Sequence, residues 1–405
     1  MFPEKIINFN FYLILLFPIA LITGPFISDI IVVLSCLLFC YYFNFSQLKI
    51  FENKLILILC LLWIASMISS IYSDDFFYSI KSSLFYFRVI IFSLVVYIIL
   101  KLKEKKLSKF FNILFFIFLV LFIDSIFQRL FGYNLIGLPL SNNIRVSSFF
   151  GNELILGSYL VKIYPILIAL VYLIKSTRFL LYFSLISITT FISVFLSAEK
   201  AALIIFIFEF FFLTFLINSN LKIKISLILF IILLFVSMCF SFPKIKNRIY
   251  DQLISNSKNF QYIYSVVHTH HYISGYKMFT DYPLIGIGPK MFRKFCSKPE
   301  YIISEFSCST HPHNYSIQLL AETGLLGFTL FICFYFILLK NFVKLILQNK
   351  NNKYKFPLYC LLLLNLINFM PLFPSGNFYN NWVSIFYSFG LGIYLYFNKK
   401  YEEKL

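Results

Sequence analysis

Charged residues are scarce in this chain, and their scarcity excludes a soluble protein. Only 13% of the 405 residues are charged, whereas 60% are hydrophobic and 21% are aromatic. A water-soluble chain of this length could not bury so much apolar surface. Glycine- or serine-rich linkers, low-complexity tracts and internal repeats are also lacking. The apolar runs are about 18–22 residues long, which matches the thickness of a bilayer, so we expect a polytopic membrane protein with helical spans.

Twelve apolar segments are candidate transmembrane helices. The first is not followed by a small-residue cleavage site, so we interpret it as a span and not as a cleaved signal. The predicted fold is an all-α bundle in which residues 1–242 hold spans one to nine, residues 243–313 form one long loop between spans nine and ten, and residues 314–405 hold the last three spans and a tail. The segments lie near residues 10–27, 29–46, 54–72, 84–100, 110–128, 154–174, 178–196, 201–218, 223–242, 315–339, 355–373 and 380–397.

Acidic residues are half as common as basic ones, with 17 Asp and Glu against 35 Lys and Arg and a net charge of +18. In a soluble protein this excess would suggest nucleic acid as a partner. Here the basic residues gather in alternate loops, as the positive-inside rule describes, so membrane lipids and not nucleic acid are the expected partners. If both termini are cytoplasmic, the external short loops hold only four basic residues. These are Lys81, Arg129, Arg145 and Lys200.

CxxC pairs are absent, which argues against a zinc ribbon. Six of the eight cysteines fall in apolar runs, and the other two, Cys296 and Cys308, share the long loop. If that loop lies in an oxidising compartment, we expect a disulfide between them; two buried free thiols are the alternative. All five histidines also lie in this loop or at its end, so a metal site is a further alternative. The histidines are His268, His270, His271, His311 and His313.

The stretch at residues 310–327, THPHNYSIQLLAETGLLG, combines polar and apolar patterns. Asn314, Gln318 and Glu322 follow one another at spacings of four, so they share one face if the segment is helical. Leucines cover its other faces. We expect a helix with a polar stripe that leads into an apolar span.

His311 and His313 precede this predicted helix, with Pro312 between them. Proline suits the first turn of a helix, where its missing N–H costs nothing. We therefore expect both histidines at a helix N-terminus, where the positive end of the helix dipole favours the neutral imidazole. A neutral imidazole can serve as a general base. A pair of interfacial histidines that only cap a helix is the alternative.

Three motifs resemble the O-antigen ligase and polymerase superfamily. His313 and Asn314 are followed by nine residues, Gly324, two residues and Gly327, which matches the family signature. The segment 281–292, DYPLIGIGPKMF, is similar to the family pattern D-x-P-L-x-G-x-G-x-x-x-F; an ordinary loop turn is the alternative. The segment 196–202, LSAEKAA, has Lys200 where the family has an arginine that holds the diphosphate of a lipid-linked donor. For that lysine, snorkelling at the interface is the alternative.

This resemblance implies a glycosyltransferase of the bacterial inner membrane. It would move a glycan from an undecaprenyl diphosphate donor to a hydroxyl of lipid A core or of another glycan, with inversion and without a metal or other cofactor. His313 would be the catalytic base, and Lys200 would offset the charge of the leaving group. Ligase, O-antigen polymerase and protein O-oligosaccharyltransferase share these motifs. A transporter is the alternative from another class, although no repeat or interrupted span pair supports it.

Further residues receive roles from the same resemblance. A second family arginine is missing, and either His268 or another loop cation such as Arg293 would replace it in binding substrate. We also expect Arg145, His311 and Asn314 to bind substrate. Structural support would come from Glu199, Gln318, Glu322, Gly324 and Gly327.

Ionisable residues inside membrane spans usually serve a site or pair with one another. Lys162 falls near or inside the sixth span, whereas Arg88, Asp124 and Glu209 are interpreted as pairing groups. The first five spans receive no role in the site.

Overall fold

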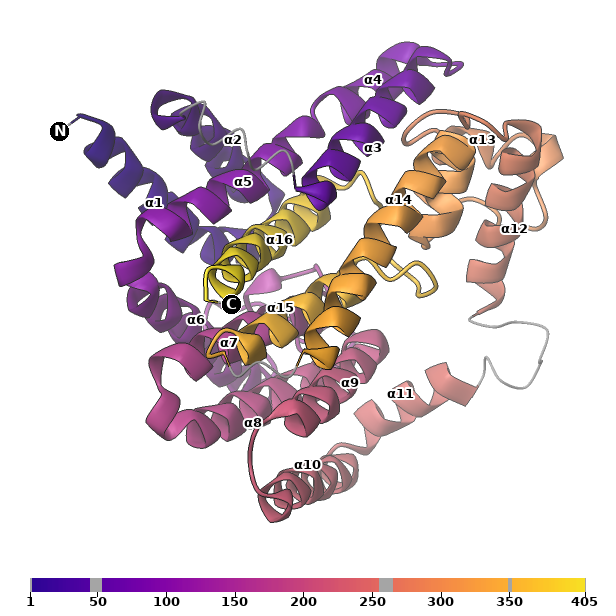
Figure 1. The fold of residues 1–405 in the computed structure, drawn as a ribbon. Helices are drawn as coiled ribbons and strands as arrows, with labels where there is room; N and C mark the ends of the chain where they lie inside the picture. The colour runs from indigo at the N-terminus through magenta and orange to yellow at the C-terminus, as the bar shows by residue number, and fades with distance from the viewer. Residues whose placement is uncertain (1, 44–52, 255–264, 349–351, 405) are drawn as a thin grey trace.

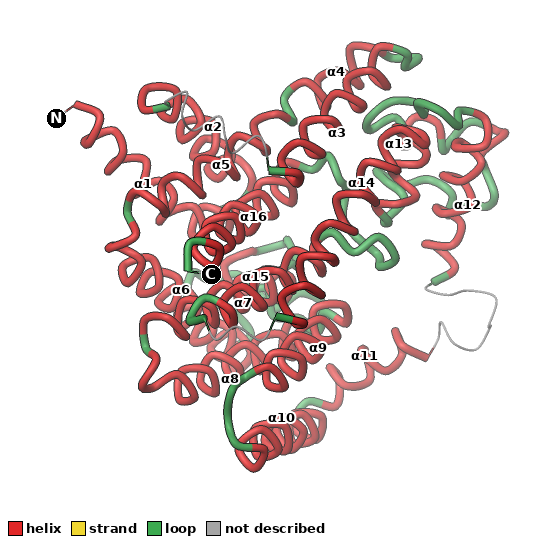
Figure 2. Tube along the Cα trace, in the orientation of Figure 1, coloured by secondary structure: helices red, strands yellow, loops and turns green. Residues whose placement is uncertain are grey.

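The computed structural model describes residues 2–43, 53–254, 265–348 and 352–404. These residues form α-helices joined by loops, and no strand occurs among them (Figure 2). The helices are α1 (Phe2–Ile22), α2 (Pro25–Tyr42), α3 (Lys54–Ile71), α4 (Phe76–Leu84), α5 (Phe87–Leu102), α6 (Leu107–Phe131), α7 (Leu156–Ile174), α8 (Phe179–Ser197), α9 (Lys200–Leu216), α10 (Leu221–Ser241), α11 (Pro243–Ile254), α12 (Val266–Asp281), α13 (Phe292–Phe295), α14 (Tyr315–Leu347), α15 (Lys355–Asn368) and α16 (Asn381–Glu402).

Every segment predicted to cross the membrane falls on a helix over its described residues; residues 44–46 of the segment 29–46 lie outside the described residues. Within the described ranges, nine helical segments are long and apolar enough to be spans. The three other predicted segments fall on α9 and α15, which have 17 and 14 residues, and on α16, which is less apolar. The chain is therefore an all-helical, multi-pass protein by length and composition.

The helices differ in how deeply they are buried. α16 lies near the centre of the bundle, packed between α5 and α15 (Figure 1). Nearly all of its residues from Ser384 to Phe397 are buried. By contrast, α10 lies at the edge, where only Ile231 and Met238 are buried. A helix that is apolar all round yet exposed is suited to lipid, so α10 is a lipid-facing helix.

The long predicted loop contains α11, α12 and α13. α12 and α13 lie beside the N-terminal half of α14, and the loops between them wrap around its start (Figure 2). Two ion pairs hold this region to the loop between α3 and α4, Lys294 with Asp75 at 2.5 Å and Lys298 with Asp74 at 3.2 Å. Residues from α12 to the start of α14 therefore form a cap over one end of the bundle.

Candidate active site

Four imidazoles meet within the cap. α12 supplies His268 and His271, and the loop before α14 supplies His311 and His313. His313 is at the centre of the group, because its ring centroid lies 4.1 Å from that of His311, 5.2 Å from His268 and 5.4 Å from His271. His270 is turned to a different partner, with Nδ1 2.7 Å from the Ser304 hydroxyl. All five histidines lie in or at the end of the predicted long loop. Four of them come together in the structure, and His270 does not join them.

The helix begins later than the proline suggests. α14 starts at Tyr315, and Asn314 is its N-cap, accepting a hydrogen bond from the Ile317 N–H at 3.1 Å. Pro312 therefore precedes the helix instead of lying in its first turn. His313 adopts a φ of 56°, a left-handed conformation that is uncommon for a residue with a side chain. Such a conformation costs free energy and is found mainly where a site requires it.

Burial keeps these histidines neutral. Loss of solvent, and after it the nearby His311, His268 and His271, lowers the pKa of His313 to about 3. Burial is also the largest cause that lowers the pKa of His311 to about 4. Desolvation therefore favours the neutral state expected from the sequence.

Two cations act on the histidine group through their charge. Lys200, at the start of α9, lowers the pKa of His268 through its charge, after the larger effect of burial. Arg293, on α13, contributes in the same way to the lowered pKa of His311. The buried Nε of Arg293 has no hydrogen-bond partner among the described residues. These two predicted phosphate-binding residues are thus both near the histidines.

Arg145 and Glu199 hold the scaffold next to Lys200. Arg145 Nε donates to the Ser197 carbonyl at 3.1 Å, and Nη2 donates to the Leu154 carbonyl at 3.2 Å, so it joins the ends of two loops. Glu199 accepts from the N–H groups of Gly157 at 2.7 Å and Ser158 at 3.1 Å, at the N-terminus of α7. The Glu199 side chain therefore binds the N-terminus of α7, and Glu199 itself is the N-cap residue of α9.

The polar stripe of α14 connects loops to the helix. Asn314 Nδ2 donates to the carbonyls of Pro371 and Phe373, both at 3.2 Å. Gln318 donates to Glu322 and to Asn377, each at 2.9 Å, and accepts from the Phe378 N–H at 2.9 Å. Glu322 also accepts from the Phe292 N–H at 3.2 Å. The stripe thus fixes residues 371–378 on one side and the start of α13 on the other.

Two glycines let two backbones meet. α14 is broken at Gly324, where φ is 61° and ψ is −161°, and the segment 283–288 enters the break. A Cβ on Gly324 would lie 2.4 Å from the carbonyl carbon of Leu284, and one on Gly286 would lie 2.4 Å from that of Glu322. The N–H groups of Ile287 and Gly288 donate to the carbonyls of Ala321 and Glu322 at 3.0 and 2.9 Å. These groups bind the protein's own helix.

The remaining support lies close by. Gly327 is buried on α14 against Thr323, one turn earlier. The serines of α3 also contact this region, because Ser69 donates to the Glu322 carbonyl at 2.6 Å and Ser73, just after α3, donates to the Ile287 carbonyl at 2.8 Å. α3 thus has a supporting role that the sequence did not indicate.

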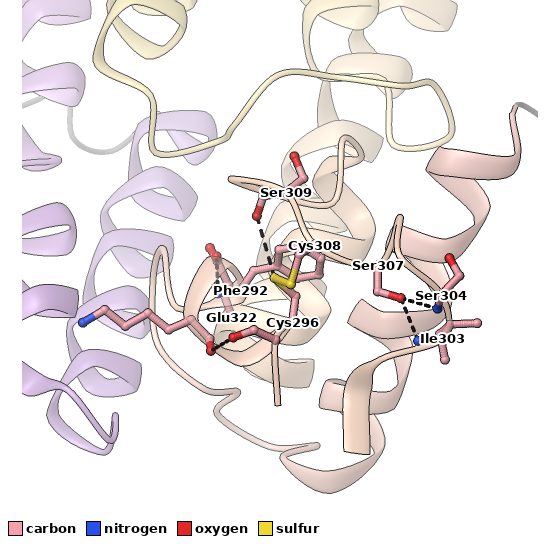
Figure 3. Close-up of a disulfide and its surroundings, with 10 residues drawn as sticks. Phe292, Cys296, Ile303, Ser304, Ser307, Cys308, Ser309 and Glu322 are labelled. Atoms are coloured by element: carbon pink, nitrogen blue, oxygen red, sulfur yellow. Dashed lines mark hydrogen bonds between the residues drawn. A yellow bond between two sulfur atoms is a disulfide. The ribbon is translucent and has the colours of Figure 1, made fainter. Parts of the chain in front are cut away.

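A disulfide closes the loop before the histidines. Cys296, directly after α13, is bonded to Cys308, and their Cα atoms are 5.0 Å apart (Figure 3). Inside this loop the Ser307 hydroxyl accepts from the N–H groups of Ile303 and Ser304 at 2.7 and 2.9 Å (Figure 3). Next to it, the Ser309 hydroxyl lies 3.2 Å from Nε2 of His313. The crosslinked loop therefore contacts the central imidazole.

His313 and His268 line a cavity of about 330 Å³. It continues between α7, α9, α15 and the loop at residues 370–376, and Lys162, Glu209 and Asn368 are also on its wall. Within the described part of the chain, no three His, Cys, Asp or Glu side chains are grouped so that they could hold a metal ion. The arrangement offers a half-buried neutral base beside a cavity, with two cations near its histidine group.

Residues 165–332 match the family model described as O-antigen ligase. The match includes Lys200, the four clustered histidines and the signature that ends at Gly327. The resemblance to the O-antigen ligase and polymerase superfamily is therefore confirmed over this segment. A comparison with curated proteins found no match.

Proposed function

We propose that the protein transfers a glycan from an undecaprenyl diphosphate donor to an acceptor hydroxyl, most favourably as a ligase that acts on lipid A core. The observation that carries this proposal is the position of His313. Its neutral imidazole is the centre of a half-buried histidine group that lines a cavity, and the charges of Lys200 and Arg293 act on other members of that group. A half-buried base with cations nearby suits an activated phosphate leaving group.

The reaction would be a single displacement. An unprotonated ring nitrogen of His313 takes the proton of the acceptor hydroxyl as the oxygen forms a bond to the anomeric carbon. The bond from that carbon to the diphosphate oxygen breaks, and undecaprenyl diphosphate leaves with the electron pair. Lys200 and Arg293 offset its charge. One in-line attack inverts the anomeric centre, and a diphosphate is a good enough leaving group to require no metal.

The low pKa of His313 matters for this role, since a base with a pKa of about 3 is weak. A bound diphosphate would bring negative charge beside the buried ring. Negative charge stabilises the imidazolium and so raises the pKa of the imidazole. We therefore expect His313 to become an effective base when the donor is bound, which also limits proton transfer to the loaded enzyme.

The test is a transfer assay with purified protein. Lipid-linked glycan is supplied with one of three acceptors: lipid A core, a second lipid-linked glycan, or a serine-containing acceptor protein. Product only with the first supports the ligase, and product with the second or third identifies a polymerase or a protein glycosylating enzyme. Chelation should leave the rate unchanged, and the new glycosidic bond should have the inverted configuration. Movement of glycan across vesicles without any new bond would identify a transporter.

We also propose that residues 243–313 face the periplasm and that both termini are cytoplasmic. A cysteine replacing the exposed Lys277 on α12 should react with a membrane-impermeant maleimide in spheroplasts. One replacing the exposed Lys105, between α5 and α6, should react only after lysis. Both are placed in a chain whose six free cysteines are replaced. Labelling of Lys105→Cys in intact spheroplasts would contradict this orientation and indicate the reverse one.

A further inference from the structure

The cavity below His313 extends into the bundle. Glu209 is nine residues after Lys200 on α9, so it lies roughly 13 Å along the helix from Lys200. Lys162 of α7, Asn368 of α15 and Ser375 line the same cavity. The site therefore has a deep polar part that the roles of His313, Lys200 and Arg293 do not use.

Several polar atoms in this deep part have no partner. Both carboxyl oxygens of Glu209, Oδ1 of Asn368 and Oγ of Ser375 are buried without a hydrogen bond to any described residue. Glu209 as a whole is only 1% exposed. Leaving buried polar groups unpaired is costly, and it is unusual enough to require an explanation.

Two other ionisable groups in the spans, Arg88 and Asp124, are paired. Arg88 forms an ion pair with Asp29 at 3.0 Å. Asp124 accepts from the Ser148 hydroxyl at 2.5 Å and from the Leu135 N–H at 2.8 Å. These two are pairing groups, as the sequence suggested, whereas Glu209 is not. Glu209 therefore differs from Arg88 and Asp124 in having no partner among the described residues, and this difference points to a ligand as its partner.

Aromatic rings and a cation complete the wall. The Lys162 ammonium lies 5.0 Å from the ring centre of Tyr387, 5.7 Å from that of Phe386 and 6.0 Å from that of Trp382. Hydrogen-bonding groups of both kinds beside aromatic faces suit a ligand that has hydroxyls and apolar C–H surfaces. The volume of about 330 Å³ is within the range of small-molecule sites.

We propose that this cavity binds the acceptor glycan. Glu209, Asn368 and Lys162 hold the hydroxyls of one sugar ring in the deep part, and the reacting hydroxyl of the glycan faces His313. The inference rests on the proposed glycan transfer and adds the acceptor site to it. Neither end of the donor lipid fits as well. An isoprenoid chain has no group to bond the Glu209 carboxyl, and a diphosphate would be repelled by it when it is ionised.

Sugar binding can be measured without any transfer. The chain has two tryptophans, and in Trp63→Phe the remaining Trp382, whose ring centre is 6.0 Å from the ammonium of the cavity residue Lys162, reports on ligand binding through its fluorescence. Donor-free protein is titrated with millimolar glucose, galactose, N-acetylglucosamine or heptose, and separately with farnesol as the isoprenoid probe. At least one sugar should give a saturable change, and farnesol should neither give one nor compete.

Glu209→Leu in this background should weaken sugar binding by roughly tenfold or more, because sugar hydroxyls lose their partner. Glu209→Gln should keep binding within a few-fold. Thr214→Val is the matched control, since Thr214 is also buried on α9 with an unpartnered hydroxyl but does not line the cavity. Glu209→Leu should melt at the same or a higher temperature, because it removes an unpaired buried carboxyl.

Three results would overturn the inference: no sugar binds, farnesol binds in place of sugars, or Glu209→Leu lowers thermal stability while sugar affinity stays unchanged. The last would make Glu209 a structural residue. Failure of the transfer assay together with sugar binding that depends on Glu209 would instead reject the proposed reaction and leave the cavity assignment intact.

Discussion

The polar stripe of α14 and the histidine cavity lie side by side, yet they differ in hydrogen bonding. Polar atoms of the stripe have partners within the protein, whereas several polar atoms around the cavity have none among the described residues. In the stripe, Gln318 uses its amide to bind Glu322, Asn377 and Phe378. In and around the cavity, atoms of Glu209, Asn368 and His311 remain without partners among the described residues. Because buried polar groups are normally paired, the first pattern is typical of a scaffold and the second of a binding site. Both regions look similar in sequence.

The largest expected effect distinguishes the two regions directly. His313→Ala should lower transfer by about 10²–10⁴-fold, the contribution of a placed general base. The protein should still fold, because one imidazole in a loop contributes little to the bundle. His270→Ala is the matched control, since His270 bonds Ser304 outside the group, and it should change the rate little. Initial rates and elution in size-exclusion chromatography measure both. Near-normal transfer by His313→Ala would contradict the assignment of His313 as the base and make His268 or His271 the candidate.

The scaffold region should respond in stability. Gly324→Ala places a Cβ into the backbone of Leu284 at a left-handed φ, so we expect a loss of at least about 2 kcal/mol and a lower melting temperature. Gly376→Ala is the control, because the nearest atom to its Cβ would be 3.5 Å away, in ordinary contact. Equal melting temperatures for the two variants would show that the break in α14 is not required.

Lys200 should have a smaller effect that appears in donor use. Lys200→Ala should raise the donor KM by roughly ten- to a hundredfold, the loss of a charge-assisted contact to phosphate. Lys200→Arg should be tolerated or improved, since arginine offers two parallel N–H groups to phosphate. Steady-state kinetics at saturating acceptor measure this. An inactive Lys200→Arg beside an active Lys200→Ala would contradict phosphate binding and favour a structural pairing.

The smallest effect concerns pH. The pKa of His313 is lowered to about 3 in the donor-free protein, so kcat/KM should show no inflection near the ordinary value of about 6.5. Stability should behave differently. Below about pH 6.5 the unfolded state binds protons that native His313 and His311 do not, so stability falls as pH decreases from there. Melting temperature against pH should flatten in His313→Ala. An inflection of kcat/KM near pH 6.5 would indicate an exposed base.

The sequence predicts the helices well because hydropathy is a local property. It also predicts the neighbourhood of His313, since the signature is contiguous. The partners of Asn314, Gln318 and Gly324 could not be predicted in this way, because they are backbone groups at Pro371, Phe378 and Leu284. Backbone groups carry no signal in residue identity. Glu209 was visible as a charge in a span, but whether it is paired depends on packing that a single sequence does not encode.

The loop at residues 371–378 has a consequence for the order in which the site forms during synthesis. The Ser375 N–H donates to the His313 carbonyl at 2.9 Å, and Asn314 and Gln318 bind other residues of the same loop. Residues 371–378 of this loop all lie outside the segment 165–332 that matches the family model. A nascent chain that has just completed its signature therefore still lacks the groups that fix the central histidine. The histidine group can therefore reach its final arrangement only after α15 and this loop have been translated. Chains that end before residue 378 should accumulate without a formed active site.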